Sequence, residues 1–273
     1  MRTEAGLQAQ PLGIVITGAG SGIGYALARE FLAAGDKVVI SARDPEKLDR
    51  AMASLRQDFP GAVLGGMICD VRDPGMVDGF ASYASRMIGR IDRWINNAGT
   101  AGMKKRPLWE LDPEDILETG MTNLSGTLLL CAAAVKVMDG QPVTEKPSYH
   151  IFNMGFSQAG AMLSRSNIPH RASKRGVALI TRFLSRELRQ KGKTSIGVHE
   201  LSPGLVLTPL LLRDTPQQTL SVLRLVARTP EDVAAVLVPK IRAISGSNRN
   251  VRFRPVMLTA LSMFIAFARK RKG

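Results

Sequence analysis

The sequence predicts an α/β fold: a single doubly wound domain with a mostly parallel sheet, plus an apolar and basic C-terminal helix. Two observations support this fold class. Short β-branched runs alternate with amphipathic stretches of helical period along most of the 273 residues. A glycine-rich turn follows the first of these runs, and no internal repeat or low-complexity linker divides the chain. We therefore expect one domain over residues 12–245 and a separate apolar segment over 250–273.

The expected elements alternate in order, which predicts βαβ units, a sheet covered on both faces and a ligand at the carboxyl ends of the strands. Asp44 and Asp112 each precede a proline, and we interpret both as helix N-caps. Strands are expected at 13–17, 37–41, 62–69, 91–96, 150–153 and 195–201, and helices at 25–34, 45–58, 75–88, 113–138 and 171–190.

The composition limits the classes of partner. A formal net charge of +14 suits nucleic acid, an anionic membrane surface or a phosphorylated cofactor. Aromatic residues make up only 5%, which argues against a base-stacking surface, so we expect no nucleic acid partner. Cys69 and Cys131 are far apart on elements expected to be buried, which predicts reduced core thiols. His150, His170 and His199 lack metal-ligand spacing, so we predict no metal.

The most informative motif is residues 17–24, Thr17-Gly18-Ala19-Gly20-Ser21-Gly22-Ile23-Gly24, between an expected strand and an expected helix. Backbone N–H groups and a helix N-terminus meet there, which makes a site for the pyrophosphate of a dinucleotide. Gly18 suits a tight turn, Gly22 lets the backbone approach the phosphates, and Gly24 lets the helix pack close to the strand. The alternative is a merely flexible turn, and the strand–turn–helix context favours the nucleotide site.

The end of the second strand indicates which dinucleotide. Ser41 and Ala42 stand where an acidic residue would bind the ribose 2′-hydroxyl of NAD. Arg43 can instead pair with a 2′-phosphate, and the alternative is that Arg43 is only a solvated surface residue. Its position after the second strand favours the first interpretation and therefore NADP(H). Asp70-Val71, after the third strand, suits contact with the adenine edge, with a simple turn cap as the alternative.

These residues together resemble the short-chain dehydrogenase/reductase family over roughly residues 12–245. The resemblance implies a Rossmann-type domain and a nicotinamide-dependent oxidoreductase, which acts as a homo-oligomer or as a subunit of a membrane complex. The motifs are residues 17–24, Asp70-Val71, Asn96-Asn97-Ala98-Gly99, Asn123, Ser157, Lys174, Pro203-Gly204 and Thr208. The implied cofactor-binding residues are Thr17, Gly18, Ser21, Gly22, Ile23, Gly24, Arg43, Asp70, Val71, Asn97, Ala98, Gly99, Lys174, Pro203, Gly204 and Thr208.

Within this family the chain is similar to the chlorophyll b reductases, in segments that include 95–100, 150–154, 197–199 and 202–208. This resemblance implies NADPH-dependent reduction of the C7 formyl group of chlorophyll b to a hydroxymethyl group. The expected location is a photosynthetic membrane, either the chloroplast thylakoid or the cytoplasmic side of a bacterial membrane.

The family's catalytic pattern is Tyr-x-x-x-Lys with a serine about a dozen residues upstream. Lys174 and Ser157 fit this pattern, but the residue four before Lys174 is His170. The resemblance implies that Ser157 bonds the substrate oxygen, that Lys174 holds the ribose, and that Asn123 supports a water relay. The Lys174 cation would disfavour a protonated imidazole. His170 is thus a replacement proton donor, the mark of a non-catalytic subunit that binds nucleotide or pigment, or a neutral change in an enzyme with another donor.

Two apolar segments bear on the substrate and the membrane. The leucine-rich residues 205–212 suit a large flat apolar ligand such as chlorophyll, or else cover the sheet edge. Residues 256–268 carry no charge and lie between Arg252 and Arg254 on one side and the basic residues 269–272 on the other. A bilayer crossing needs about 20 apolar residues, so we expect this helix to lie in the interface, with its basic ends on anionic head groups. The alternative is a helix in an oligomer interface.

Overall fold

The computed structural model of the chain describes residues 10–155, 166–214 and 227–253. Within these residues, seven strands form one sheet in the order β3-β2-β1-β4-β5-β6-β7, and every neighbouring pair is parallel. The predicted doubly wound α/β domain is therefore confirmed. The strands are β1 (Gly13–Ile16), β2 (Lys37–Ala42), β3 (Leu64–Ile68), β4 (Arg93–Asn96), β5 (Tyr149–Met154), β6 (Ile196–Ser202) and β7 (Asn250–Arg252).

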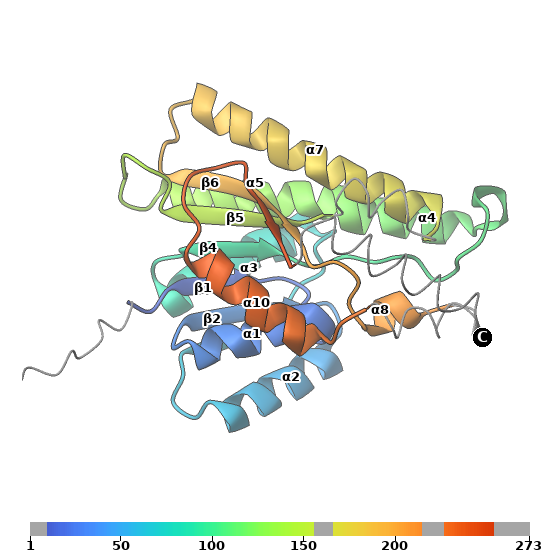
Figure 1. Cartoon of the computed structure of the whole chain (residues 1–273), viewed down its shortest axis with the longest axis horizontal. Coiled ribbons are helices and arrows are strands. Elements are labelled where there is room, and N and C mark those ends of the chain that lie inside the picture. Colours follow the sequence, from blue (N-terminus) through green and yellow to red (C-terminus); the bar gives the residue numbers. More distant parts are fainter. Residues whose placement is uncertain (1–9, 156–165, 215–226, 254–273) are drawn as a thin grey trace, which may run out of the picture.

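Helices cover both faces of the sheet (Figure 1). One layer consists of α1, α2 and α10, and the other of α3, α5 and α7. The helices are α1 (Gly22–Ala33), α2 (Pro45–Asp58), α3 (Pro74–Ile88), η1 (Leu108–Glu110), α4 (Pro113–Gly120), η2 (Met121–Ser125), α5 (Gly126–Asp139), α7 (Ile168–Gln190), α8 (Pro209–Leu212) and α10 (Pro230–Arg242).

The strands are buried on both faces because successive side chains point to opposite helical layers. Ile14 and Ile16 of β1 pack in the core beneath α1, α2 and α10. Val15, between them, packs in the core beneath α3, α5 and α7. This arrangement explains the continuous apolar runs that the sequence shows at the strands.

The connection order places a switch point beside β1. The chain runs from β1 outward to β3, and β4 then pairs with the other side of β1. Ligands of such sheets bind outside the carboxyl ends of the strands at this point. The glycine turn after β1 lies there.

Asp44 caps α2 as predicted, because its side chain accepts a hydrogen bond from the Lys47 N–H at 3.1 Å. Asp112 occupies the N-cap position of α4 as predicted, directly before Pro113, but its side chain makes no capping hydrogen bond. The carboxylate instead accepts a hydrogen bond from Lys104 Nζ at 2.9 Å, so a nearby cation replaces the helix N–H as its partner.

The helix expected at 113–138 is not continuous in its hydrogen bonding. A π-helical turn, η2, separates α4 from α5 and contains Asn123. Turns of this type are often found at functional sites.

The stretch Pro113–Asp139 is long and apolar enough to cross a membrane, with a mean hydropathy of 1.4. In the structure it packs on the sheet, where α5 contacts α3 and η2 contacts α7. Of its most apolar 18-residue window 44% is buried, whereas Leu117 and Leu128 are 63% and 53% exposed, so packing in the core accounts for only part of its apolar composition.

The expected C-terminal helical segment, 250–273, needs a correction at its start. Residues Asn250–Arg252 form β7, which pairs with Glu200–Ser202 at the edge of the sheet. A strand of three residues with only one apolar member, Val251, shows no alternation from which to predict it. The apolar residues 256–268 and their basic C-terminal flank lie outside the described residues.

The two tryptophans allow a matched test of the core. Trp94 is fully buried, packs edge-on against Phe80 with ring centroids 6.0 Å apart, and donates a hydrogen bond to Asn96. We expect Trp94→Ala to lower the free energy of unfolding by about 3–5 kcal/mol in urea denaturation. Trp109 is 84% exposed, so Trp109→Ala should change that energy by less than about 0.5 kcal/mol. Equal effects of the two substitutions would contradict this packing.

Candidate active site

The glycine turn is fastened to the end of β4 by Asn97. The Asn97 Nδ2 group donates hydrogen bonds to the carbonyl oxygens of Thr17 and Gly18, each at 2.9 Å. The Ala98 N–H donates to Thr17 Oγ1 at 3.1 Å. Residues 17–18 and 97–98 therefore meet at the switch point.

Steric limits explain the glycines of this turn. Gly18 has a positive φ of 65°, and a Cβ there would lie 2.7 Å from Ala98 Cα. A Cβ at Gly24 would lie 2.4 Å from Asn97 Nδ2 and would disrupt the bonds just described. Larger residues at these positions would separate α1 from the end of β4.

The N-terminus of α1 fits an anionic ligand. Ser21 occupies the N-cap position but makes no side-chain capping bond, and Ile23 packs partly buried against the core. Gly22 has a φ of 61°, which keeps the backbone free of side-chain bulk at the start of the helix. First-turn N–H groups and the helix dipole suit a pyrophosphate, so this turn fits the dinucleotide that the sequence predicts.

The segment after β6 returns to the glycine turn. Pro203-Gly204 leads out of the strand, with Gly204 at a φ of 78°. Thr208 caps α8 by accepting a hydrogen bond from the Leu211 N–H at 3.3 Å. The methyl group of Thr208 would lie 3.3 Å from a Cβ at Gly22. The predicted residues Gly22 and Thr208 are thus neighbours although they are far apart in the sequence.

Asn123, in the π turn, is held between the loop after β4 and α7. Its Oδ1 accepts a hydrogen bond from the Thr100 N–H, and its Nδ2 donates to Thr100 O and to Ser173 Oγ, all at 2.9 Å. Ser173 Oγ in turn donates to the backbone carbonyl of His170 at 3.0 Å. The π turn thus connects the end of β4 to the beginning of α7.

Lys174 lies beside this network. Its Nζ donates to the carbonyl of Met154, at the end of β5, at 2.9 Å. A Cβ at Gly99 would lie 3.0 Å from Asn123 Oδ1 and 3.3 Å from Lys174 Nζ. The structure therefore brings together Gly99, Asn123 and Lys174 from three separate parts of the chain.

His170 is buried in the first turn of α7. Its N–H donates to Asn167 Oδ1, the N-cap of the helix, at 3.0 Å. The Asn167 Nδ2 group donates to the carbonyl oxygens of Ala101 and Lys104 at 3.1 and 3.0 Å. The beginning of α7 is therefore fixed to the loop that follows β4.

Electrostatics make His170 a neutral side chain. Burial, together with the nearby cations Lys174 and Lys105, lowers its pKa to about 3. Burial also lowers the pKa of Lys174, to about 8. At pH 7 the site therefore holds a neutral imidazole four residues before a charged lysine whose proton is unusually labile.

The cofactor side carries a group of alternating charges. Arg43 Nη1 donates to Glu118 Oε1 of α4 at 2.6 Å. Asp70 accepts from the Arg72 N–H at 3.0 Å and from Arg72 Nε at 2.9 Å, so it stabilises the turn after β3. Val71 is buried, and a Cβ at Gly126 would lie 2.7 Å from its Cγ2 atom. The structure thus gives Val71 a packing contact with the start of α5.

Some site residues were missed from the sequence. Asn167 precedes Pro169 and carries an N-cap signal like that of Asp44, so it was open to prediction. Thr100, Ser173 and Glu118 have no such signal, because only the fold brings them to Asn123 and Arg43. Ser157, the expected partner of the substrate oxygen, lies outside the described residues.

The cysteines and the metal prediction lie apart from this site. Cys69 and Cys131 are buried free thiols, as predicted, and burial raises the pKa of each to about 12. Among the residues described, no three His, Cys, Asp or Glu side chains gather to hold a metal ion. The absence of a metal stays a prediction.

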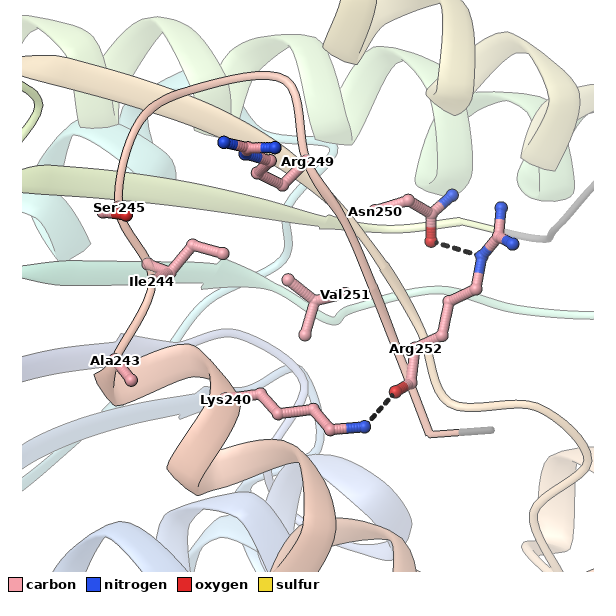
Figure 2. Close-up of a pocket in the computed structure, with 8 residues that line it drawn as sticks. All are labelled: Lys240, Ala243, Ile244, Ser245, Arg249, Asn250, Val251 and Arg252. Atoms are coloured by element: carbon pink, nitrogen blue, oxygen red, sulfur yellow. Dashed lines mark hydrogen bonds between the residues drawn. The ribbon is translucent and has the colours of Figure 1, made fainter. Parts of the chain in front are cut away.

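A hollow of about 510 Å³ opens elsewhere, beside the edge strand β7 (Figure 2). Lys240 Nζ donates to the Arg252 carbonyl and Arg252 Nε donates to Asn250 Oδ1, each at 2.8 Å. Figure 2 shows the side chains of Lys240, Arg249 and Arg252 pointing in different directions, so they do not converge on one ligand. None of the predicted site residues lines this hollow.

Comparisons with known proteins agree with this arrangement. A family model described as short chain dehydrogenase matches residues 13–219. The chain is 39% identical to the chloroplastic chlorophyll(ide) b reductase NOL of Arabidopsis thaliana over 87% of this chain and 67% of that protein. A short chain dehydrogenase/reductase from Burkholderia phymatum in complex with NAD has a TM-score of 0.74 at 27% identity, covering 94% of this chain and 93% of that one. An NADPH-bound short chain oxidoreductase from Pseudomonas aeruginosa PAO1, containing an atypical catalytic center, has a TM-score of 0.72 at 26% identity, covering 90% and 98%.

The three histidines predict the pH dependence of stability. Burial lowers the pKa of His150 and His170 to about 3 and that of His199 to about 4, below an unfolded value of about 6.5. Between pH of about 4 and 6.5 these histidines bind more protons in the unfolded chain, so their contribution to the free energy of unfolding should fall as the pH is lowered through this range. Urea denaturation at several pH values measures this fall. Histidine NMR signals that titrate near 6.5 in the folded protein would contradict the prediction.

Proposed function

Because the chain belongs to the short-chain dehydrogenase family and is an oxidoreductase of that family, we propose that it reduces the formyl group of chlorophyll b to a hydroxymethyl group with NADPH. The observation that carries this proposal is the meeting of the glycine turn, Asn123 and Lys174 at one sheet edge. The identity with a chlorophyll(ide) b reductase supports the choice of substrate.

Arg43 supports NADPH over NADH. It follows β2 directly, while Ser41 is buried and Ala42 carries no polar group, so neither supplies a carboxylate for a ribose 2′-hydroxyl. A guanidinium pairs well with a phosphate. In the proposed complex the glycine turn holds the pyrophosphate, Arg43 holds the 2′-phosphate, and Lys174 holds the nicotinamide ribose.

When bound, NADPH supplies the hydride that the carbonyl carbon accepts. The carbonyl oxygen must also gain a proton. His170 is neutral at pH 7, so it serves as a hydrogen-bond donor that polarises the carbonyl. Lys174 Nζ holds a proton with a pKa of about 8, close to the pH at which an acid is most effective. Lys174 is therefore the source of the proton in this proposal.

The proposed location is the surface of a photosynthetic membrane, the thylakoid in a chloroplast. The chloroplastic relative and the net charge of +14 support it, because anionic lipids attract basic segments. The proposed assembly is a homo-oligomer or a subunit of a membrane complex, with the basic C-terminal flank on the lipid head groups.

The direct test supplies chlorophyll b in detergent and follows both NADPH oxidation and the hydroxymethyl product. We expect NADPH to support faster turnover than NADH at equal concentration.

Arg43→Gln should weaken NADPH binding by about 10- to 100-fold, since a charge-assisted bond is worth about 1.5–3 kcal/mol. Arg50→Gln, on the exposed face of α2, is the matched control and should leave NADPH binding unchanged. NADPH binding without turnover on any carbonyl compound would favour a nucleotide- or pigment-binding subunit instead.

The proton source predicts a pH profile and a gain of function. Turnover should fall as the pH rises above about 8, because Lys174 Nζ then loses its proton. Lys174→Met should abolish turnover, and Lys191→Met, at the exposed end of α7, should not. His170→Tyr adds an acidic hydroxyl and should raise turnover by about 10²-fold. Turnover that is constant from pH 7 to 10 would contradict the role of Lys174.

A further inference from the structure

Arg43 belongs to a series of ion pairs that also includes Glu118 and Arg72. Glu118 Oε1 is 2.6 Å from Arg43 Nη1 and 3.9 Å from Arg72 Nη1. Arg72 uses Nε and Nη2 to bind the carboxylate of Asp70. The order is therefore Asp70, Arg72, Glu118, Arg43, with the charge alternating at each step. Glu118 stands between two guanidinium groups and is bonded to one of them.

This position conflicts with the binding of a phosphate by Arg43. A 2′-phosphate brings roughly two negative charges to a guanidinium that a carboxylate already holds. The Glu118 carboxylate and a 2′-phosphate on the same guanidinium would repel each other, so either the phosphate binds weakly or the carboxylate moves. The Nη1 atom of Arg72 offers the second position, because the bonds to Asp70 leave that atom facing Glu118.

We propose that Glu118 is a specificity-determining residue that moves from Arg43 to Arg72 when a 2′-phosphate binds. The inference rests on the proposed use of NADP(H). Glu118 thereby reduces the affinity of Arg43 for the 2′-phosphate below what Arg43 alone would give. A ligand with a free 2′-hydroxyl leaves the pair between Arg43 and Glu118 in place. Glu118 thus affects only the binding of ligands that carry a 2′-phosphate.

The test uses adenosine 2′,5′-bisphosphate and 5′-AMP, which differ only in the 2′-phosphate, and isothermal titration calorimetry of the full chain. Glu118→Gln should tighten bisphosphate binding by about three- to fivefold at low salt and leave AMP binding unchanged. The side chain of Arg43 is 56% exposed, so high salt should reduce this gain. Loss of the gain at high salt distinguishes a charge effect from a change of shape.

A second substitution tests the transfer to Arg72. Arg72→Gln removes the second position of the carboxylate, so it should lower the preference for bisphosphate over AMP in the wild-type background. In the Glu118→Gln background the same change should not alter that preference. Arg72→Gln also removes a partner of Asp70, which is expected to contact the adenine. Because both ligands carry the adenine, this effect cancels in the ratio of their affinities.

Glu114→Gln is the matched control, because it removes one exposed acid from the same helix and should leave the ratio unchanged. The inference is overturned if Glu118→Gln leaves the ratio unchanged or weakens bisphosphate binding. Arg43→Gln separates this failure from failure of the NADP(H) assignment. If the ratio depends on Arg43 but not on Glu118, only the inference fails. If it depends on neither, the assignment fails as well.

Discussion

The carboxamide of Asn97 is the contact on which the rest of the site depends. Its two hydrogen bonds to the carbonyl oxygens of Thr17 and Gly18 join the turn after β1 to the end of β4. Gly24 must lack a side chain for these bonds to form, because a Cβ there would collide with the same Nδ2 group. The start of α1 is thereby held at the sheet edge, where its N–H groups are available to an anion.

The same edge collects the groups to which the proposed mechanism assigns the chemistry. Asn123 connects Thr100 to Ser173, and Ser173 contacts the backbone of His170, so the loop after β4, the π turn and α7 form one network. Burial within this network sets the charges of the two side chains that matter most. His170 is kept neutral, and Lys174 keeps a proton that it can release near physiological pH. In the proposed mechanism, the acid is therefore Lys174 and not the side chain at the family's tyrosine position.

Much of the fold was predictable because it depends on local patterns. Apolar runs, glycines and the Asp-Pro start of α2 are signals that neighbouring residues carry, and the parallel sheet follows from their order. The π turn and the missing side-chain bond of the Asp112 cap were not predictable, because neither has a signal in the local sequence. Only the folded chain brings Asn123 to Ser173 and Asp112 to Lys104. The pairing of Arg43 with Glu118 was missed for the same reason. The sequence predicts that Arg43 is available to bind a phosphate, whereas in the structure the Glu118 carboxylate from α4 already binds it.

Hydrogen–deuterium exchange of the full chain with and without NADPH measures the central claim most directly. The claim is that a nicotinamide dinucleotide binds at the edge formed by residues 17–24 and 97–100. It predicts slower exchange of the amides in these two segments when NADPH is added, with no change in β7 or around the hollow beside it. Unchanged exchange at the glycine turn, or protection confined to residues 240–252, would contradict the account.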